Sequence, residues 1–448
     1  MSGGPEAVRR DVSADVLIVG GGPAGLAAAR ALRQQGAGRV VVVEREAEAG
    51  GIPRHSDHPG YGILDLHRPL TGPAYARRLV DLAAGAGAEI WTETSVTSWA
   101  PGANGVEAAL GRTVDTTSPA GLLRIAAGAV VLATGCRERP RSARLIPGPR
   151  PQGIYTTGQL QQAVHLKNAP IGRRAVVVGA EHVSYSALLT LAHAKVKAIA
   201  LVTEHARHQS YGPIVAATAT RMHVPLLAGQ RVVGVVGRAR VEGVEIADLA
   251  TGATRTIPCD VLVFTADWIP DHEIARLGGL DMDPGTLGPR IDASFATSVP
   301  GVFAVGNLLH GAETSDVVMG EGSRVATPVT AWLTRREAGS AATADRLPIA
   351  VAEPVAWVTP NVARVGESGP LSLRVSRIVE RGTVEVAQGE RTLWRGHGRT
   401  GMLSMLGNVV PSRLAAGALV PGRAIHIPGG WLRDVRADGP APVVRVRE

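Results

Sequence analysis

The glycines of one turn close to the N-terminus constrain this chain more than any other residues. They are Gly20, Gly22 and Gly25. An apolar run, 16–19, leads into the turn, and a helical pattern over 26–32 follows it. A second apolar run, 40–43, ends at Glu44, nineteen residues after the last glycine. Strand, glycine turn, helix and acidic residue in this order make up the dinucleotide-binding fingerprint, so the chain is expected to fold around a Rossmann-type unit.

The three glycines have separate tasks in such a turn. Gly20 allows the tight bend, Gly22 lets a pyrophosphate reach the backbone, and Gly25 lets helix and strand pack closely. The helix N-terminus then faces the phosphate charge, and Glu44 can accept a hydrogen bond from a ribose hydroxyl. The alternative is a tight turn between strand and helix that holds no ligand, which the complete fingerprint disfavours.

A second copy of this cycle begins at Arg173. Its turn glycine is Gly179 and its acidic residue is Glu204, 25 residues later, against 24 residues between the matching positions of the first copy. Its expected elements are strand 175–178, helix 186–194 and strand 198–202. The chain thus carries two dinucleotide-fold cycles.

The turn of the second cycle departs from the fingerprint. Glu181 and Ser184 stand where the first cycle has Gly22 and Gly25. A carboxylate at the position of closest approach places a side chain and a negative charge where a pyrophosphate would lie, which weakens binding of NAD(P) in its normal pose. Two interpretations stay open: a structural or repurposed domain, and an NAD(P) site of altered pose.

Length and composition indicate more than one domain. The chain has 448 residues, 45% of them hydrophobic and 19% charged, which suits a globular protein of two or three domains. From about residue 350 short β-type runs alternate with turn signals. We expect an α/β fold with two Rossmann-like three-layer domains and a small C-terminal β-rich domain. The expected boundaries are 12–150 with 290–345 for the first Rossmann-like domain, 151–289 for the second domain and 350–448 for the β-rich domain.

Several further elements are expected between these landmarks. They are helix 73–86, strand 89–96, a hairpin within 106–123, an apolar run over 129–133 and a helix over 316–336 that Asp316 would cap.

The sequence argues against several partners. No apolar run approaches the roughly 18 residues of a membrane span, and the first eleven residues lack the apolar core of a signal peptide, so a cytoplasmic location is expected. The net charge is +8, but only three of the 47 basic residues are lysines and aromatic residues make up 3%. Scattered arginines without aromatic neighbours do not favour nucleic acid. An anionic substrate stays open.

The two cysteines, Cys136 and Cys259, lie 123 residues apart. They form no C-x-x-C pair, so this chain cannot build a redox-relay motif, a four-thiolate zinc site or an iron–sulfur site from them. A disulfide between them is not expected in a reducing compartment. A buried structural thiol is the favoured interpretation of Cys136.

Taken together, these elements resemble the FAD-binding pyridine nucleotide–disulfide oxidoreductases, without the redox disulfide. In that class a strand ending Ala-Thr-Gly closes the first half of the FAD domain, and residues 133–135 match it. A later strand ends in Gly-Asp, whose carboxylate binds the ribityl chain, and here Asn307 replaces that Asp. The resemblance and the fingerprint imply these FAD-binding residues: Gly20, Gly22, Pro23, Ala24, Gly25, Glu44, Arg45, Gly51, Ile52, Val96, Ala133, Thr134, Gly135, Gly306 and Asn307. NAD(P) stays open as a second cofactor.

Three segments, 50–59, 70–76 and 133–141, narrow the resemblance. They are similar to the FAD subunits of amine and amino-acid dehydrogenases, namely opine oxidases, hydrogen cyanide synthase and dye-linked proline dehydrogenase. The resemblance covers roughly residues 12–340. It implies oxidation of a C–N bond by hydride transfer to flavin, often in a heteromer with a second flavin subunit. It also implies that the helix after Asn307 aims its N-terminus at the pyrimidine side of the flavin.

The candidate catalytic residues are His55, His58 and Glu313. The two histidines lie in a Gly/Pro-rich loop and titrate near neutral pH, which suits contacts to substrate or flavin. The alternative is one turn cap and one solvated side chain. A metal is disfavoured because no third ligand is suitably spaced. Glu313 would lie near the isoalloxazine.

Three functions therefore compete. The leading hypothesis is an FAD-dependent dehydrogenase or oxidase for an amine or amino-acid derivative. The second is an NAD(P)H-dependent flavoprotein reductase that feeds a partner. The third is a scaffold or electron-relay subunit of a heteromeric flavoenzyme.

Overall fold

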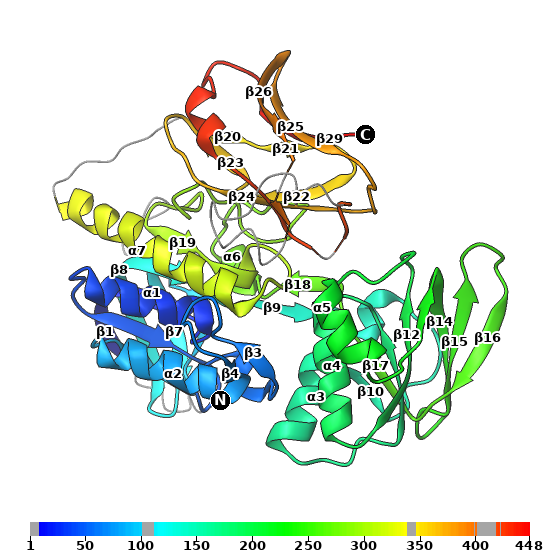
Figure 1. Ribbon diagram of the computed structural model, residues 1–448. Helices are drawn as coiled ribbons and strands as arrows, with labels where there is room; N and C mark the ends of the chain where they lie inside the picture. Colours follow the sequence, from blue (N-terminus) through cyan, green and yellow to red (C-terminus); the bar gives the residue numbers. More distant parts are fainter. Residues whose placement is uncertain (1–8, 101–111, 338–345, 398, 401–417, 422) are drawn as a thin grey trace, which may run out of the picture.

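The computed structural model describes residues 9–100, 112–337, 346–397, 399–400, 418–421 and 423–448. Figure 1 shows two α/β units side by side and a β-rich C-terminal group above them. Within these ranges no helix combines the length and the apolar character that a membrane crossing needs. The predicted α/β class is confirmed, whereas the predicted domain boundaries stay a prediction.

The first unit is a mixed sheet that carries the N-terminal glycine turn. Its strands in spatial order are β5 (Glu89–Trp91), β2 (Val40–Val43), β1 (Arg10–Val19), β8 (Gly121–Leu132), β7 (Thr113–Ser118) and β6 (Ser95–Trp99), and β19 (Val302–Ala304) pairs with the end of β8. β1 runs parallel to β2 and β8, whereas β7 and β6 fold back antiparallel. Residues 16–18 and 40–43 are at most 2% exposed, as expected for strands covered on both faces.

Helices pack on this sheet and on one another. They are α1 (Pro23–Gln34), α2 (Gly72–Gly85), α6 (Glu273–Leu277) and α7 (Ser315–Glu337). α1 packs against both α2 and α7. At Gly322 of α7 an added Cβ would stand 2.0 Å from the carbonyl oxygen of Ala24, so only glycine permits this approach.

The second unit is a parallel sheet with a smaller antiparallel sheet beside it. The parallel strands in order are β10 (Ile154–Thr156), β17 (Val261–Phe264), β11 (Arg174–Val178), β12 (Lys197–Thr203) and β13 (Leu226–Ala228). Its helices are α3 (Thr157–Gln161), α4 (His182–His193) and α5 (Gly212–Val215). The antiparallel sheet is β14 (Gln230–Val236), β15 (Gly243–Asp248) and β16 (Thr254–Pro258).

Two chain crossings join the units. β9 (Cys136–Glu138) and β18 (Trp268–Pro270) are these crossings, and they pair antiparallel between the two units (Figure 1).

The loop after β2 contains the 3₁₀ turn η1 (Ile52–His55) and a short antiparallel pair of strands, β3 (Pro59–Tyr61) and β4 (Leu70–Thr71). Other short 3₁₀ and π turns are η2 (Arg141–Arg144), η3 (Gln162–Leu166), η4 (Ala216–Thr220), η5 (Gly306–Leu308) and η9 (Gly430–Asp434).

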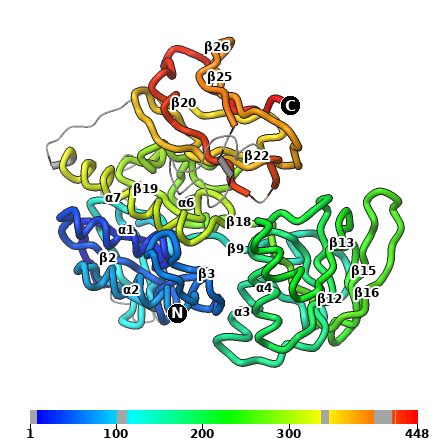
Figure 2. The backbone as a smooth tube through the Cα atoms, in the orientation of Figure 1, coloured from blue at the N-terminus to red at the C-terminus, as the bar shows by residue number. Residues whose placement is uncertain are grey.

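The C-terminal group has a hydrophobic core of its own. One sheet is β21 (Ala350–Val351), β29 (Val443–Arg447), β25 (Thr383–Gln388) and β26 (Arg391–Gly396), and the other is β22 (Val355–Thr359), β24 (Leu371–Val375), β28 (Ile425–Ile427) and β27 (Arg399–Thr400). β20 (Arg346–Pro348) pairs with β23 (Val362–Arg364). The tube view shows this group over the first unit and reaching the crossing (Figure 2).

Two expectations about elements are wrong. The single strand expected over 89–96 is two strands, β5 and β6, because the chain bends between them and Glu93 adopts φ +52°. α7 begins at Ser315, so Asp316 lies in its first turn and is not its cap. The hairpin expected within 106–123 is confirmed from residue 113 on, where β7 and β8 pair antiparallel; residues 106–111 lie outside the described ranges.

Candidate functional site

The first glycine turn is closed by protein atoms at two glycines and open at the third. A Cβ on Gly20 (φ +108°) would stand 2.4 Å from the Ala133 carbonyl oxygen, and one on Gly25 would stand 2.0 Å from the Gly20 carbonyl oxygen. On Gly22 the nearest atom would be the Gly51 Cα, 3.9 Å away. The space above Gly22 is therefore open at the N-terminus of α1, where backbone N–H groups lack helical partners.

The acidic end of the fingerprint is fixed beside this opening. Glu44 is 7% exposed, and its Oε2 accepts from the Gly21 N–H at 2.9 Å while its Oε1 accepts from the Glu46 N–H at 2.9 Å. Ile52, an apolar residue, is 55% exposed, and Arg45 is exposed as well. An anchored carboxylate and an uncovered apolar side chain at one turn suit a ribose and an apolar ring system.

The opposite end of the turn is formed by β8 and β19. The Thr134 hydroxyl donates to a backbone carbonyl at 2.7 Å, and Gly135 and Gly306 have φ of +77° and +73°. Asn307 Oδ1 accepts from the Glu313 N–H at 2.8 Å, and the Asn307 amide nitrogen has no partner in the described ranges. Asn307 thus offers a free donor at the position where the sequence suggested an acceptor.

The remaining predicted cofactor contacts are Pro23 and Ala24 beside Gly22, and Val96 on β6 at the edge of the sheet. Pro23 begins α1, Ala24 is buried, and Val96 is half-buried on β6. A glycine that has no steric neighbour at the turn, an anchored carboxylate and a free amide donor all fit FAD.

His55 and His58 lie in and just after η1, and both are desolvated. His55 is 5% exposed, and its Nδ1 has no partner among the described residues. Burial, and then the charge of Arg54, lower the pKa of His55 to about 4. Burial also lowers the pKa of His58. Both rings are therefore neutral near pH 7.

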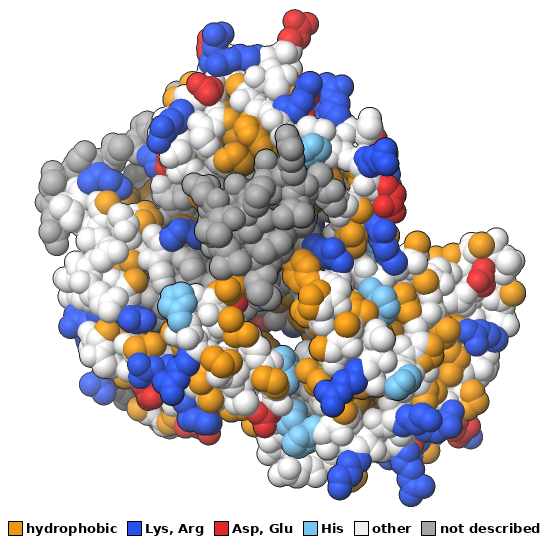
Figure 3. All heavy atoms as spheres, viewed as in Figure 1, with side chains coloured by type: hydrophobic (Ala, Val, Ile, Leu, Met, Phe, Trp, Pro, Cys, Tyr) orange, Lys and Arg blue, Asp and Glu red, His pale blue; other side chains and the backbone are white. Residues whose placement is uncertain are grey.

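His58 links the first unit to the second. Its Nδ1 lies 2.9 Å from the Pro59 carbonyl oxygen, which can only accept, so Nδ1 carries the proton. Its Nε2 therefore accepts from hydroxyls, with Ser186 Oγ of α4 at 2.8 Å and Ser56 Oγ at 3.1 Å. Gln161 of α3 donates to Ser186 at 2.9 Å. Figure 3 shows histidine side chains along a hollow where the two units approach each other.

Glu313 lies between η5 and α7 and contacts the C-terminal group. Its Oε1 accepts from Arg374 Nη2 of β24 at 2.5 Å, and the same nitrogen donates to the Ala312 carbonyl at 2.8 Å. The Arg374 guanidinium lies 5.4 Å from the centroid of the Trp357 ring, and its Nε has no partner in the described part of the chain. Arg374 could not be predicted from the sequence, because no motif distinguishes it from the many other arginines.

The second glycine turn is filled by its own side chains. Glu181 is 7% exposed, and its Oε1 accepts from Trp268 Nε1 of β18 at 2.7 Å. Burial raises the pKa of Glu181. Ser184 is fully buried with its Oγ 2.5 Å from Thr265 Oγ1. A Cβ on Gly179 would stand 2.1 Å from the same Thr265 oxygen. The turn that is open in the first unit is closed here.

All three parts of the molecule meet at one partly buried polar cluster, which we call the junction: Glu181, His182, Glu313, Arg374 and Arg423. His182 Nδ1 lies 2.7 Å from Ser210 Oγ. Burial lowers the pKa of His182 to about 4; the charges of Arg374 and Arg423 add to this shift, and the charge of Glu313 opposes it. The charge of Arg374 opposes the pKa rise at Glu181. Opposite charges held in a desolvated cluster are typical of a binding site.

The residues that bear on metal and thiol chemistry are the candidate metal ligands and the two cysteines. Within the described ranges no three His, Cys, Asp or Glu side chains are grouped to hold a metal ion. Cys136 and Cys259 are both free, and burial raises the pKa of the Cys136 thiol to about 12. A protonated thiol far from the only other cysteine cannot act as a redox dithiol.

Known proteins resemble this chain in sequence. Residues 14–322 match the model of the pyridine nucleotide-disulphide oxidoreductase family. An opine oxidase subunit of Agrobacterium tumefaciens (strain Ach5) is 25% identical over 331 residues, which cover 68% of this chain and 63% of that protein. The alpha subunit of sarcosine oxidase from Corynebacterium sp. (strain P-1) is 34% identical over 188 residues, 40% of this chain and 18% of that protein. The chain thus spans less than two thirds of both relatives.

Solved structures share the fold. Thioredoxin reductase from T. acidophilum has a TM-score of 0.60 at 21% identity, covering 71% of this chain and 98% of that one. L-proline dehydrogenase from P. horikoshii has a TM-score of 0.51 at 20% identity, covering 75% and 58%. The family consists of FAD-binding oxidoreductases, and NAD(P) is also used within it. Because the family model matches more than half of the chain, the chain belongs to the pyridine nucleotide-disulphide oxidoreductase family.

Proposed function

We propose that the chain is a dehydrogenase or oxidase that acts on the C–N bond of an amine or amino-acid derivative. When bound at the first glycine turn, FAD supplies the hydride acceptor. The observation that carries the proposal is the closed second turn, where the Glu181 carboxyl group is buried and accepts a hydrogen bond from Trp268. A buried carboxyl group at this turn disfavours the pyrophosphate of a nicotinamide dinucleotide. The absence of a dithiol argues against disulfide reduction, although thioredoxin reductases share the fold.

The junction supports an amino-acid-like substrate. Glu313 and Arg374 present opposite charges in a desolvated setting, and Arg374 Nε is a buried donor with no partner among the described residues. An ammonium group complements the carboxylate, and a substrate carboxylate complements the guanidinium. In this proposal Glu313 contacts the amine and Arg374 contacts the acid, while His55 and His58 line the neighbouring loop as neutral hydrogen-bonding groups. The names of the two relatives, an opine oxidase and a sarcosine oxidase, point to the same chemistry.

An anaerobic titration of the purified, FAD-loaded protein tests this function. We expect amino acids or N-alkyl amino acids to bleach the flavin absorbance, and NADH and NADPH at about 1 mM to leave it unchanged. Bleaching by NAD(P)H alone would replace the proposal with a flavoprotein reductase. An Arg374→Lys variant should raise the substrate concentration needed for bleaching, because Lys lacks the planar fork that binds a carboxylate through two hydrogen bonds.

A second candidate is a relay subunit of a heteromeric flavoenzyme. Two observations favour it: both relatives are named as subunits of an oxidase, and this chain spans only part of the length of each relative. In that case dithionite would bleach the isolated chain, and no amine would do so until a second flavoprotein was supplied as its partner.

A further inference from the structure

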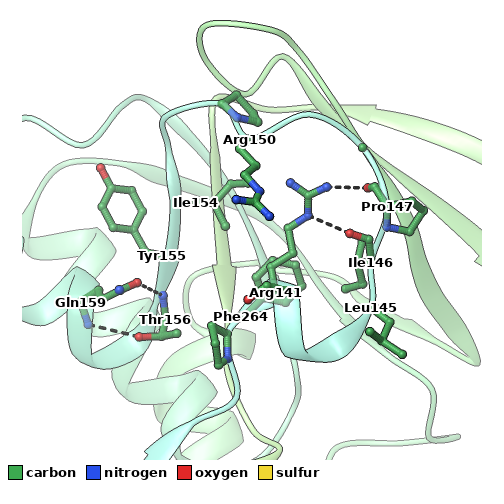
Figure 4. Close-up of a pocket in the computed structure, with 14 residues that line it drawn as sticks. Arg141, Leu145, Ile146, Pro147, Arg150, Ile154, Tyr155, Thr156, Gln159 and Phe264 are labelled. Atoms are coloured by element: carbon green, nitrogen blue, oxygen red, sulfur yellow. Dashed lines mark hydrogen bonds between the residues drawn. The ribbon is translucent and has the colours of Figure 1, made fainter.

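An open groove of about 620 Å³ is lined by residues that belong to neither glycine turn nor to the junction. The chain segment that follows β9 forms one wall, and β10 with the end of β17 forms the other (Figure 4). We call it the arginine groove after Arg141 and Arg150. Its volume lies within the range of about 300–1,000 Å³ that is usual for small-molecule sites.

The two arginines of the groove have no acidic counterpart there. Figure 4 shows their guanidinium groups side by side, and no Asp or Glu lines the groove. Arg141 donates only to backbone carbonyls, those of Ile146 at 3.1 Å and of Pro147 and Pro149. Burial and then the charge of Arg150 lower the pKa of Arg141. Two adjacent cations without an anion favour binding of an oxyanion.

Each guanidinium has donors left for a ligand. Arginine has five N–H donors, and Arg141 spends three of its nitrogens on the carbonyls that hold it in place. Arg150 is exposed and has no partner within the described ranges. Arg141 is therefore a fixed half of the site, and Arg150 is a half that is free to close on a ligand.

The rest of the groove is largely apolar. Leu145 stands at its edge, 87% exposed and held at φ +56°, and Ile154 and Phe264 line the walls with several prolines. Tyr155 and Gln159 add polar groups at the side away from Leu145. A bare inorganic ion would leave this apolar lining exposed to water, whereas an anion with an apolar or aromatic body would cover it.

We propose that the arginine groove binds a small organic oxyanion, a phosphate ester or a carboxylate carried on an apolar body. The shared chemistry is a guanidinium pair on the oxyanion and apolar contacts on the body. This site is independent of the proposed amine oxidation, since none of its residues belongs to the glycine turns or the junction.

Calorimetric titration of the full-length, FAD-loaded protein tests the proposal. The probes are phenyl phosphate and benzoate. The controls are inorganic phosphate, which lacks the apolar body, and phenol, which lacks the negative charge. We expect phenyl phosphate or benzoate to bind at least about tenfold more tightly than either control, a difference of about 1.4 kcal/mol. Which of the two binds identifies the oxyanion. Equal binding of inorganic phosphate, or binding of neither organic anion, overturns the proposal.

Arg150→Ala is the decisive variant, because that side chain makes no contact on which the fold depends. It should weaken the organic anion about tenfold or more, while Arg150→Lys should retain part of the affinity. Arg231→Ala, which removes an exposed arginine of β14, is the matched control and should bind normally. Unchanged affinity in Arg150→Ala, with flavin absorbance and melting temperature preserved, overturns the proposal as well.

Discussion

Gly22 and Gly25 belong to one turn, but a side chain would have a different effect at each of the two positions. A side chain on Gly25 would collide with the Gly20 backbone, whereas a side chain on Gly22 would enter open space. We therefore expect Gly22→Ala to fold normally and to bind FAD at least about tenfold more weakly, and Gly22→Glu to lose it entirely. Gly25→Ala should instead lower the free energy of unfolding by about 1–3 kcal/mol. Flavin content after gel filtration and urea unfolding of the apoprotein separate the two effects. Full flavin retention in Gly22→Glu would mean that FAD lies elsewhere.

Asp316, in the first turn of α7, predicts a pH dependence. Burial and then the neighbouring Asp65 raise the pKa of Asp316 to about 7. The folded state therefore holds a proton that the unfolded state releases near pH 4, so this group's contribution to stability is lost as pH rises from about 4 through 7. Between about pH 5 and pH 8 the wild-type protein should lose about 1–2 kcal/mol more than Asp316→Asn, which cannot ionise. The free energies of unfolding are measured by urea unfolding at both pH values. An equal loss in wild type and in Asp316→Asn would contradict the raised pKa of Asp316.

Whether a residue of the candidate site could be predicted from the sequence depends on how far away in the sequence its partners lie. The turn glycines and Glu44 could be predicted, because strand, turn, helix and acid are local and periodic. The contact of Arg374 with Glu313 spans 61 residues, and the bond from Trp268 to Glu181 spans 87. Such contacts depend on how separate units dock, which no local pattern encodes. His58 was chosen for its ring chemistry, yet its bond to Ser186 of the second unit was not expected.

At the scale of elements, β25 holds a buried acid among exposed bases. Glu385 is fully buried and accepts from Arg395 of β26 and from Arg445 and Arg447 of β29. Hydrogen bonds from Arg447 and Arg445, the largest contributions, lower the pKa of Glu385 to about 2. Its contribution to stability is thus present above about pH 4.5 and lost as pH falls toward 2.

Glu385→Gln should therefore reduce the stability of the C-terminal group at neutral pH by about 1–2 kcal/mol, since the three arginines are partly solvated. The difference from wild type should shrink on acidification toward pH 2. Thermal unfolding followed by tryptophan fluorescence measures both. A variant as stable as wild type at neutral pH would show that the cluster is merely a surface feature.

Elements with a buried, continuous apolar run were predicted best. β2 has the bounds expected from the sequence, and the ends of α2 and α7 are displaced by about one residue. The sheet β14–β16 was missed: β16 is mostly exposed and so lacks an apolar face that would mark it. The polar start of β1 is a strand only because it pairs with β8, a partner more than a hundred residues away.

At the scale of the whole molecule, the C-terminal group is tied to the second unit by a few contacts. Arg423 donates to the Ser210 carbonyl and stacks at 5.2 Å over Tyr211. Arg207 pairs with Glu380 at 3.1 Å, with both side chains largely exposed. These contacts lie beside the closed second turn, so the C-terminal group helps to keep it covered.

Arg423→Ala should weaken this attachment by about 1–2 kcal/mol through the lost stacking and hydrogen bond. Amide hydrogen exchange should rise around residues 210–212, with flavin content unchanged. Arg207→Ala is the matched control, and loss of its exposed pair should cost no more than about 0.5 kcal/mol. Equal exchange in the two variants would show that Arg423 does not hold the units together.

The central claim is that this chain has two dinucleotide-type turns and one working dinucleotide site. The most direct test is the number of dinucleotides bound per chain, measured as FAD released on denaturation together with equilibrium binding of NADH and NADPH to the FAD-loaded protein. The structure predicts one FAD per chain and no saturable NAD(P)H binding up to about 1 mM, because Glu181 fills the second turn. One FAD plus one stoichiometric NAD(P)H per chain would contradict the account.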